Sequence, residues 1–165
     1  LLEIPLNSPD ACESIRIAAE HCGSRQMPGA GTVLTVEEVR NVRAAGGEFI
    51  ISPNADPPVI RATVEAGMIS IPGFFTASEG FAALREGADY LKFFPATLGP
   101  GYIKDLQAVI KAQILAVGGV NNATISDFLK VCAGVGIGGA LYRSGKALSD
   151  IAADAEAIVK AAGEI

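Results

Sequence analysis

The chain has 165 residues, of which 50% are hydrophobic and 19% are charged, and its formal net charge is −5. This composition supports a packed core and excludes a disordered chain. No cluster of Lys and Arg forms a basic stripe, so nucleic acid is disfavoured as a partner.

The cysteines Cys12, Cys22 and Cys132 form no C-x-x-C pair. Their odd number disfavours a disulfide framework, and their spacing disfavours a zinc site. No cluster of His, Asp and Glu has the spacing of metal ligands, and no apolar run reaches membrane-spanning length. We therefore expect a cytoplasmic protein that uses no metal or cofactor and has no membrane partner.

Short apolar runs alternate with helix-length segments along the chain. The runs expected to form strands are 1–6, 26–33, 48–52, 68–71, 90–94, 114–117 and 134–137. The segments expected to form helices are 9–22, 36–45, 57–66, 77–86, 102–111, 122–131 and 147–162. Strict alternation of this kind predicts a parallel sheet covered by helices.

Local capping signals support several of these boundaries. Thr35 is followed three residues later by Glu38, which is the pattern of a capping box. Weaker N-cap candidates are Ser78, Asn121 and Ser149. The glycines that stand where helices are expected to end are Gly46, Gly67 and Gly87.

The pattern contains seven strand–helix units, whereas a closed (β/α)8 barrel needs eight. The units alone leave two α/β architectures open: a doubly wound open sheet, and a barrel that lacks its first strand. The absence of a G-x-G-x-x-G fingerprint counts against the first. In both cases residues 1–165 form a single domain.

Lys92 lies within the apolar strand expected at 90–94. Strand alternation places Tyr90, Lys92 and Phe94 on one face. Burial disfavours the charged form of a lysine and lowers its pKa, and a neutral amine is what attack on a ketone requires. The alternative is a surface lysine near the end of a strand, and the pattern leaves both open.

Glu3 lies inside the apolar strand expected at 1–6. A carboxylate in such surroundings could serve as a general base with a raised pKa. A structural ion pair or a charge at the edge of the sheet would explain the same pattern.

Two pairs of glycines follow consecutive expected strands near the end of the chain. Gly118 and Gly119 follow the strand at 114–117, and Gly138 and Gly139 follow the strand at 134–137. Glycines allow backbone N–H groups to approach a ligand, and barrels commonly bind phosphate in the loops after their last two strands. Close packing at turns would explain each pair singly, but their coincidence less well.

Thr32 and Thr76 stand at strand ends, where their hydroxyl groups could bind a substrate carboxylate. A turn or helix-capping role is the simpler explanation of each threonine. His21, the only histidine, lies near the end of an expected helix, where we expect a surface position rather than a catalytic one.

The segment 91–96, which surrounds Lys92, resembles the Schiff-base motif of the 2-keto-3-deoxy-6-phosphogluconate and 4-hydroxy-2-oxoglutarate aldolases. The resemblance runs from end to end, with further matches at 29–34, 52–54, 72–73 and 116–120. Segments 3–9, 99–104 and 141–143 are similar to the branch that acts on 2-keto-3-deoxy-6-phosphogalactonate.

The resemblance implies a (β/α)8 TIM barrel, a homotrimer and a lyase of galactonate catabolism. This enzyme would cleave a phosphorylated keto-deoxy sugar acid to pyruvate and glyceraldehyde 3-phosphate. It assigns the Schiff base to Lys92 and general acid/base work to Glu3. The implied substrate-binding residues are Thr32, beside the pyruvate moiety, and Pro72, Gly73 and Thr76. The implied phosphate-binding residues are Gly118, Gly119, Gly138 and Gly139.

The chain departs from the family pattern in two places. The family's first strand, which carries an arginine that binds the substrate carboxylate, is not found in this sequence, so the single domain 1–165 is expected to be incomplete at its N-terminus. Gly139 stands where a serine is usual in the phosphate loop.

Three alternatives stay open. The chain could belong to the gluconate or 4-hydroxy-2-oxoglutarate branch of the same family. It could be another phosphate-binding barrel, such as an isomerase or an enzyme similar to thiamin-phosphate synthase, which would not need Lys92. It could also be a non-catalytic barrel that binds sugar phosphates.

Overall fold

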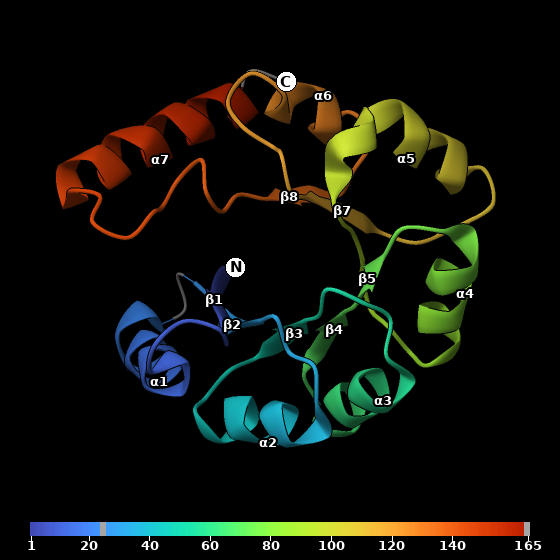
Figure 1. Ribbon diagram of the computed structural model, residues 1–165, viewed down its shortest axis with the longest axis horizontal. Helices are drawn as coiled ribbons and strands as arrows, with labels where there is room; N and C mark the ends of the chain where they lie inside the picture. The colour runs from blue at the N-terminus through green and yellow to red at the C-terminus, as the bar shows by residue number, and fades with distance from the viewer. Residues whose placement is uncertain (24–25, 164–165) are drawn as a thin grey trace. The chain divides into compact units, whose positions relative to one another are not determined.

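A computed structural model describes residues 1–23 and 26–163 (Figure 1). The chain divides into two compact units, Leu1–Lys92 and Phe93–Ile165. Strands and helices follow one another in the predicted order through both units. None of the described helices has the length and apolar character needed to span a bilayer.

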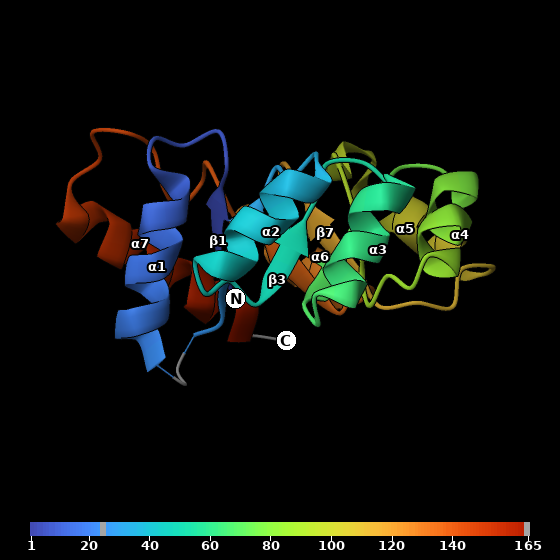
Figure 2. The ribbon, with the colours of Figure 1, turned by 90° about the horizontal axis from the view of Figure 1, so that it is seen from below.

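The first unit is built on four parallel strands that are neighbours in chain order. They are β1 (Leu2–Pro5), β2 (Pro28–Gly31), β3 (Phe49–Ile51) and β4 (Ile69–Ile71). The helices of this unit are α1 (Ala11–Cys22), α2 (Val36–Ala44), α3 (Pro57–Glu65) and α4 (Ala77–Arg85). Figures 1 and 2 show α1, α2 and α3 along one side of this sheet, as the predicted alternation requires.

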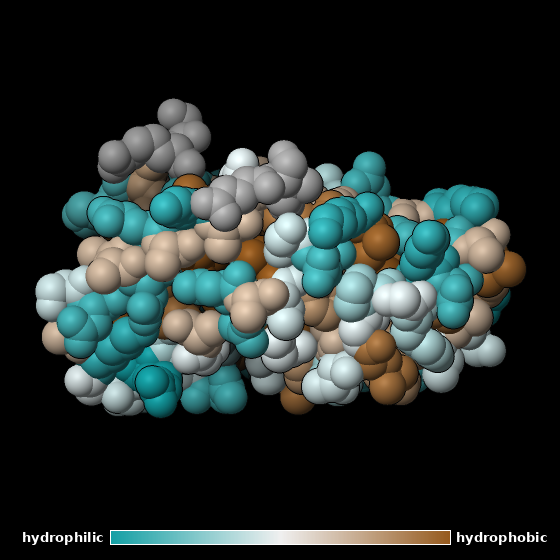
Figure 3. Space-filling view, turned by 90° about the horizontal axis from the view of Figure 1, so that it is seen from above, coloured by the Kyte–Doolittle hydropathy of each residue, from teal (hydrophilic) through white to brown (hydrophobic). Residues whose placement is uncertain are grey.

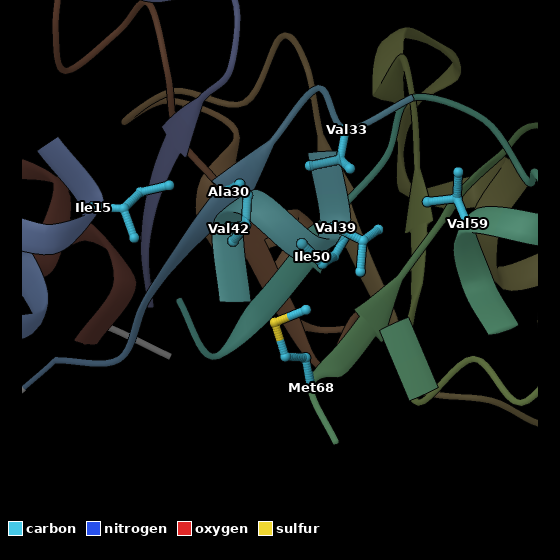
Figure 4. Close-up of a cluster of buried hydrophobic side chains, with 8 residues drawn as sticks. All are labelled: Ile15, Ala30, Val33, Val39, Val42, Ile50, Val59 and Met68. Carbon is cyan, nitrogen blue, oxygen red and sulfur yellow. The ribbon is translucent and has the colours of Figure 1, made fainter. Parts of the chain in front are cut away.

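A hydrophobic core lies between these helices and the sheet (Figure 4). Its buried members come from α1, β2, α2, β3, α3 and the segments beside them: Ile15, Ala30, Val33, Val39, Val42, Ile50, Val59 and Met68. Because strands of a parallel sheet are buried on both faces, β2 and β3 carry buried residues at every position. The core therefore holds the strands rigidly in register beneath the loops at their carboxyl ends.

The strand expected at 68–71 differs from the observed one. The structure has β4 at Ile69–Ile71 and a separate two-residue strand, β5, at Gly73–Phe74. Pro72 separates them because proline has no N–H to donate to a sheet. No helix intervenes between β4 and β5, so the alternation still contains seven strand–helix units.

Helix boundaries follow the local signals where these were strong. Thr35 and Glu38 form the predicted capping box at the start of α2. The three glycines expected after helices each have positive φ, as left-handed helix ends require: Gly46, Gly67 and Gly87.

The weaker N-cap predictions were wrong. The N-cap of α4 is Thr76, which forms a capping box with Glu79, so Ser78 lies inside the helix. Ser149 lies inside α7 (Leu148–Gly163). The side chain of Asn121 accepts a hydrogen bond in the turn before α6, whose N-cap is Thr124.

The second unit contains β7 (Ile114–Val117) and β8 (Gly134–Gly136), which pair in parallel. Its helices are the 3-10 turn η2 (Ala96–Leu98), α5 (Gly99–Gln107), α6 (Ile125–Leu129) and α7. Helix α5 begins three residues before the predicted start because proline is well tolerated in the first turn of a helix. Strand β6 (Leu91–Phe93) spans the sequence boundary between the two units, which falls between Lys92 and Phe93.

Candidate active site

Lys92 is the central residue of β6, and all three residues of this strand are buried. Its side chain is only 6% exposed, so the alternative of a surface lysine was wrong. The backbone N–H of Lys92 donates a hydrogen bond of 2.8 Å to the carbonyl oxygen of Pro72. Burial lowers the pKa of the Lys92 amine below its ordinary value, as a nucleophilic amine needs.

Glu3 is the second residue of β1 and is half-buried. Burial raises the pKa of its carboxyl group, and the positive charge of Lys92 acts in the opposite direction. The same interaction raises the pKa of Lys92 against the larger effect of burial. The two groups therefore interact electrostatically, and burial favours the neutral form of each.

A carboxyl group with a raised pKa and an amine with a lowered pKa are suited to proton transfer. A general acid or base works best when its pKa approaches the working pH, and burial moves both pKa values in that direction. Both groups lie within the first unit of the chain, and a role in catalysis for either stays a prediction.

Thr32 follows the last residue of β2 and has φ of 57°. A β-branched residue in the left-handed region is unusual, and such strained residues tend to cluster at functional sites. This conformation turns the chain at the carboxyl edge of the sheet, which is the edge where barrel enzymes place their active sites. No local sequence signal pointed to the backbone conformation of Thr32.

Pro72 and Gly73 are both buried. A side chain at Gly73 would collide with the backbone of Pro53 and would lie 2.9 Å from the N atom of Asn54. Glycine is therefore required for the loop after β3 to pack against the start of β5. This packing places Pro72, the partner of Lys92, in a fixed position.

Thr76 takes part in a helix cap. Its hydroxyl group donates a hydrogen bond of 2.8 Å to Glu79 and accepts one from the backbone N–H of the same residue. The spacing of Thr76 and Glu79 repeats that of Thr35 and Glu38, so the sequence did carry this signal. Its role in substrate binding stays a prediction.

The two glycine pairs lie in the second unit and differ in geometry. Gly118 and Gly119 have φ of 89° and 83°, which favours glycine at both positions. Gly138 and Gly139 are exposed, and a Cβ atom added at either position would have no neighbour within 4 Å. Because β7 and β8 are parallel, both pairs follow the same edge of this sheet.

The remaining sequence expectations concern metals and His21. Within residues 1–23 and 26–163, no group of three or more His, Cys, Asp and Glu residues is arranged to hold a metal ion. His21 is exposed in the last turn of α1, and its Nδ1 lies 2.9 Å from the carbonyl oxygen of Ile17. Its predicted surface position is confirmed.

The KDPG and KHG aldolase family model matches residues 1–160. The chain belongs to this family. Its fold is therefore of the (β/α)8 barrel type and the protein is an aldolase, as the resemblance implied.

Individual members of the family are similar over nearly the whole chain. The 2-dehydro-3-deoxy-6-phosphogalactonate aldolase of Escherichia coli K12 is 43% identical over 164 residues, which are 97% of this chain and 80% of that one. A solved structure described as native KDPGal superposes with a TM-score of 0.95 at 43% identity, covering 98% of this chain and 81% of the other.

A further similar structure contains a covalent intermediate. The KDPG aldolase of Legionella pneumophila, in a structure with pyruvate captured as a covalent carbinolamine, is 29% identical with a TM-score of 0.74. The match covers 81% of this chain and 68% of that one. These findings do not favour the alternatives to a galactonate-branch aldolase that the sequence left open.

Proposed function

We propose that this aldolase cleaves 2-keto-3-deoxy-6-phosphogalactonate to pyruvate and glyceraldehyde 3-phosphate through a Schiff base on Lys92. The observation that carries the proposal is the buried Lys92 amine, whose pKa is lowered and which is coupled to the carboxyl group of Glu3. The galactonate substrate is supported by the similarity to the 2-dehydro-3-deoxy-6-phosphogalactonate aldolase of Escherichia coli K12, which is 43% identical.

The reaction begins when neutral Nζ of Lys92 adds to the C2 carbonyl carbon of the substrate. The resulting carbinolamine loses its hydroxyl group as water and becomes an iminium ion. The carbinolamine captured in the Legionella pneumophila relative is the corresponding species in that protein. The iminium nitrogen then serves as the electron acceptor for bond cleavage.

Glu3 is the group proposed to move protons in the next steps. Removal of the proton from the C4 hydroxyl lets the C3–C4 bond break, and its electron pair passes to the iminium nitrogen through C3 and C2. Glyceraldehyde 3-phosphate leaves, and an enamine of pyruvate remains on Lys92. Return of a proton to C3 and addition of water release pyruvate and restore the amine. A carboxyl group with a raised pKa can carry protons in both directions.

The other site residues are proposed to bind and orient the substrate. Thr32 follows β2 and Pro72 follows β4, both at the carboxyl ends of strands in the unit that carries Glu3 and Lys92, which supports contact of Thr32, Pro72 and Gly73 with the keto-acid part of the substrate. The backbone N–H groups of the two glycine pairs would bind the phosphate. Binding energy from the phosphate, which does not react, would help to orient the reacting carbons.

We also propose a homotrimer and a cytoplasmic location. Large hydrophobic side chains are exposed on several elements, and Figure 3 shows hydrophobic groups among hydrophilic ones on the face viewed there. Contact between copies of the chain would cover part of this surface. Free Cys12, Cys22 and Cys132 and a phosphorylated metabolite as substrate support a cytoplasmic location.

Borohydride trapping tests the proposed function. Incubation with pyruvate and sodium borohydride should reduce the iminium ion to a stable amine, and peptide mapping should find the modification on Lys92. Lys104 and Lys111 are exposed internal controls that should stay unmodified. Modification of either control without modification of Lys92 would refute the assignment.

A further inference from the structure

The carboxyl group of Glu3 occupies the space that a side chain on Gly31 would need. A Cβ atom built on Gly31 would overlap Oε1 of Glu3 and would lie 2.6 Å from Cδ and 2.9 Å from Cγ. Distances under 3.0 Å are essentially never found for real Cβ atoms. Glu3 can therefore keep its position only while residue 31 has no side chain.

The backbone of Gly31 gives no other reason for glycine. Gly31 is not among the glycines with positive φ, so its conformation is open to other residues. It pairs with Pro5 in the β1–β2 register, and its carbonyl oxygen accepts a hydrogen bond of 2.9 Å from the N–H of Leu6. These contacts hold the Gly31 backbone in place, so a new side chain there would displace Glu3 rather than the strand.

The position of Gly31 in β2 explains why its contact with Glu3 matters for the reaction. Glu3 pairs in register with Gly29, but its carboxyl group lies against Gly31, two residues nearer the carboxyl end of β2. Gly31 is the last residue of β2, directly before Thr32. The side chain of Glu3 thus extends along the sheet to the edge where barrel enzymes bind substrate.

We propose that Gly31 is a positioning residue, whose missing side chain leaves the space through which the carboxyl group of Glu3 reaches the substrate. This inference rests on the proposed function, in which Glu3 transfers protons to and from the enamine on Lys92. Gly31 itself touches no reacting atom and acts only through Glu3.

The Gly31→Ala variant separates positioning from folding. It should fold, because the displaced atoms belong to the flexible end of one side chain. Trapping of pyruvate on Lys92 by borohydride should stay within about 3-fold of wild type. Exchange of the pyruvate methyl protons in deuterated water, followed by NMR, should fall at least about 10-fold, since acid/base groups contribute about 10²–10⁴-fold. A purely structural role would lower trapping and exchange together.

A double-mutant cycle with Glu3→Asp gives the second readout. The shorter aspartate withdraws from the space that an alanine at position 31 would fill. Gly31→Ala should therefore cost less than about 3-fold in exchange when Glu3→Asp is already present, because the two residues are in contact and their effects do not add. Gly101→Ala is the matched control: it has open space around it and no positive φ, and should leave both rates unchanged.

The outcomes distinguish this inference from the function on which it rests. If wild-type Lys92 is not trapped, the proposed function fails and the role of Gly31 fails with it. If wild type is trapped and exchanges protons, but Gly31→Ala keeps full exchange, only the positioning role is overturned. An equal loss of exchange with and without Glu3→Asp would overturn it as well.

Discussion

Replacing the buried nucleophile should make the protein inactive and more stable at the same time. The perturbation is Lys92→Met, which keeps an unbranched side chain of similar size and removes the amine. Without the amine no iminium ion can form, so cleavage should fall below detection. Met also suits the buried position better than a charged group, because Lys92 is only 6% exposed.

The sign of the stability change follows from the pKa of Lys92. Burial lowers this pKa below its ordinary value of 10.5, although the Glu3 carboxylate acts in the opposite direction. The unfolded chain therefore binds more protons than the folded one between the folded-state pKa and 10.5. Wild-type stability should rise with pH through this window, and the full penalty for a charged Lys92 applies below it.

Lys92→Met removes this penalty, and each pKa unit corresponds to about 1.4 kcal/mol of unfolding free energy. Urea denaturation at pH 7 to 10 measures the effect. At pH 7 the variant should gain more than the roughly 0.5 kcal/mol that surface substitutions produce, and the gain should shrink as pH rises. Lys104→Met, at an exposed position on α5, is the matched control and should stay within about 0.5 kcal/mol of wild type.

A Lys92→Met variant that is no more stable than wild type at pH 7 would contradict the expected penalty for burying the amine. Unfolding free energies of wild type and Lys92→Met that change in parallel from pH 7 to 10 would contradict it as well. Either result would mean that the amine is not held in a low-pKa environment by burial.

Three further predictions concern the reaction. Glu3→Gln should slow exchange of the pyruvate methyl protons, measured by NMR in deuterated water, by about 10²–10⁴-fold while trapping on Lys92 persists; unchanged exchange would make Glu3 a structural residue. Activity should survive exhaustive chelation with EDTA, because the iminium ion takes the place of a Lewis acid; loss of activity that a divalent ion restores would contradict this. Finally, kcat/KM should be several-fold higher for the galactonate than for the gluconate substrate. The two differ at C4, and Glu3 lies in the segment 3–9, which is similar to the galactonate branch. One hydrogen-bonded hydroxyl is worth about 1 kcal/mol, which gives preference without exclusivity. A clear preference for gluconate in side-by-side kinetics would place the enzyme in the sister branch.

Features that depend on neighbours in sequence could be predicted well. The capping box of Thr35 and Glu38 involves residues three apart, and the glycine at position 46 ends its helix through its own φ. The same local logic applies to Thr76 and Glu79, where the pattern was present but the cap was assigned to Ser78. The apolar residues on either side of Lys92 allowed both a buried and a surface lysine, and the structure shows the buried one.

The sequence by itself therefore determined the alternation of strands and helices and most helix ends, because these depend on short-range periodicity and backbone preferences. Only the tertiary structure decided which distant residues meet. Glu3 and Lys92 lie 89 positions apart by their numbers, and their electrostatic coupling exists only when β1 and β6 are folded. The contact of Glu3 with Gly31 arises from the register of β1 against β2, since a shift of one residue would turn every side chain to the other face. The left-handed backbone of Thr32 and the break at Pro72 likewise depend on how the loops at the carboxyl edge pack, which no local pattern specifies.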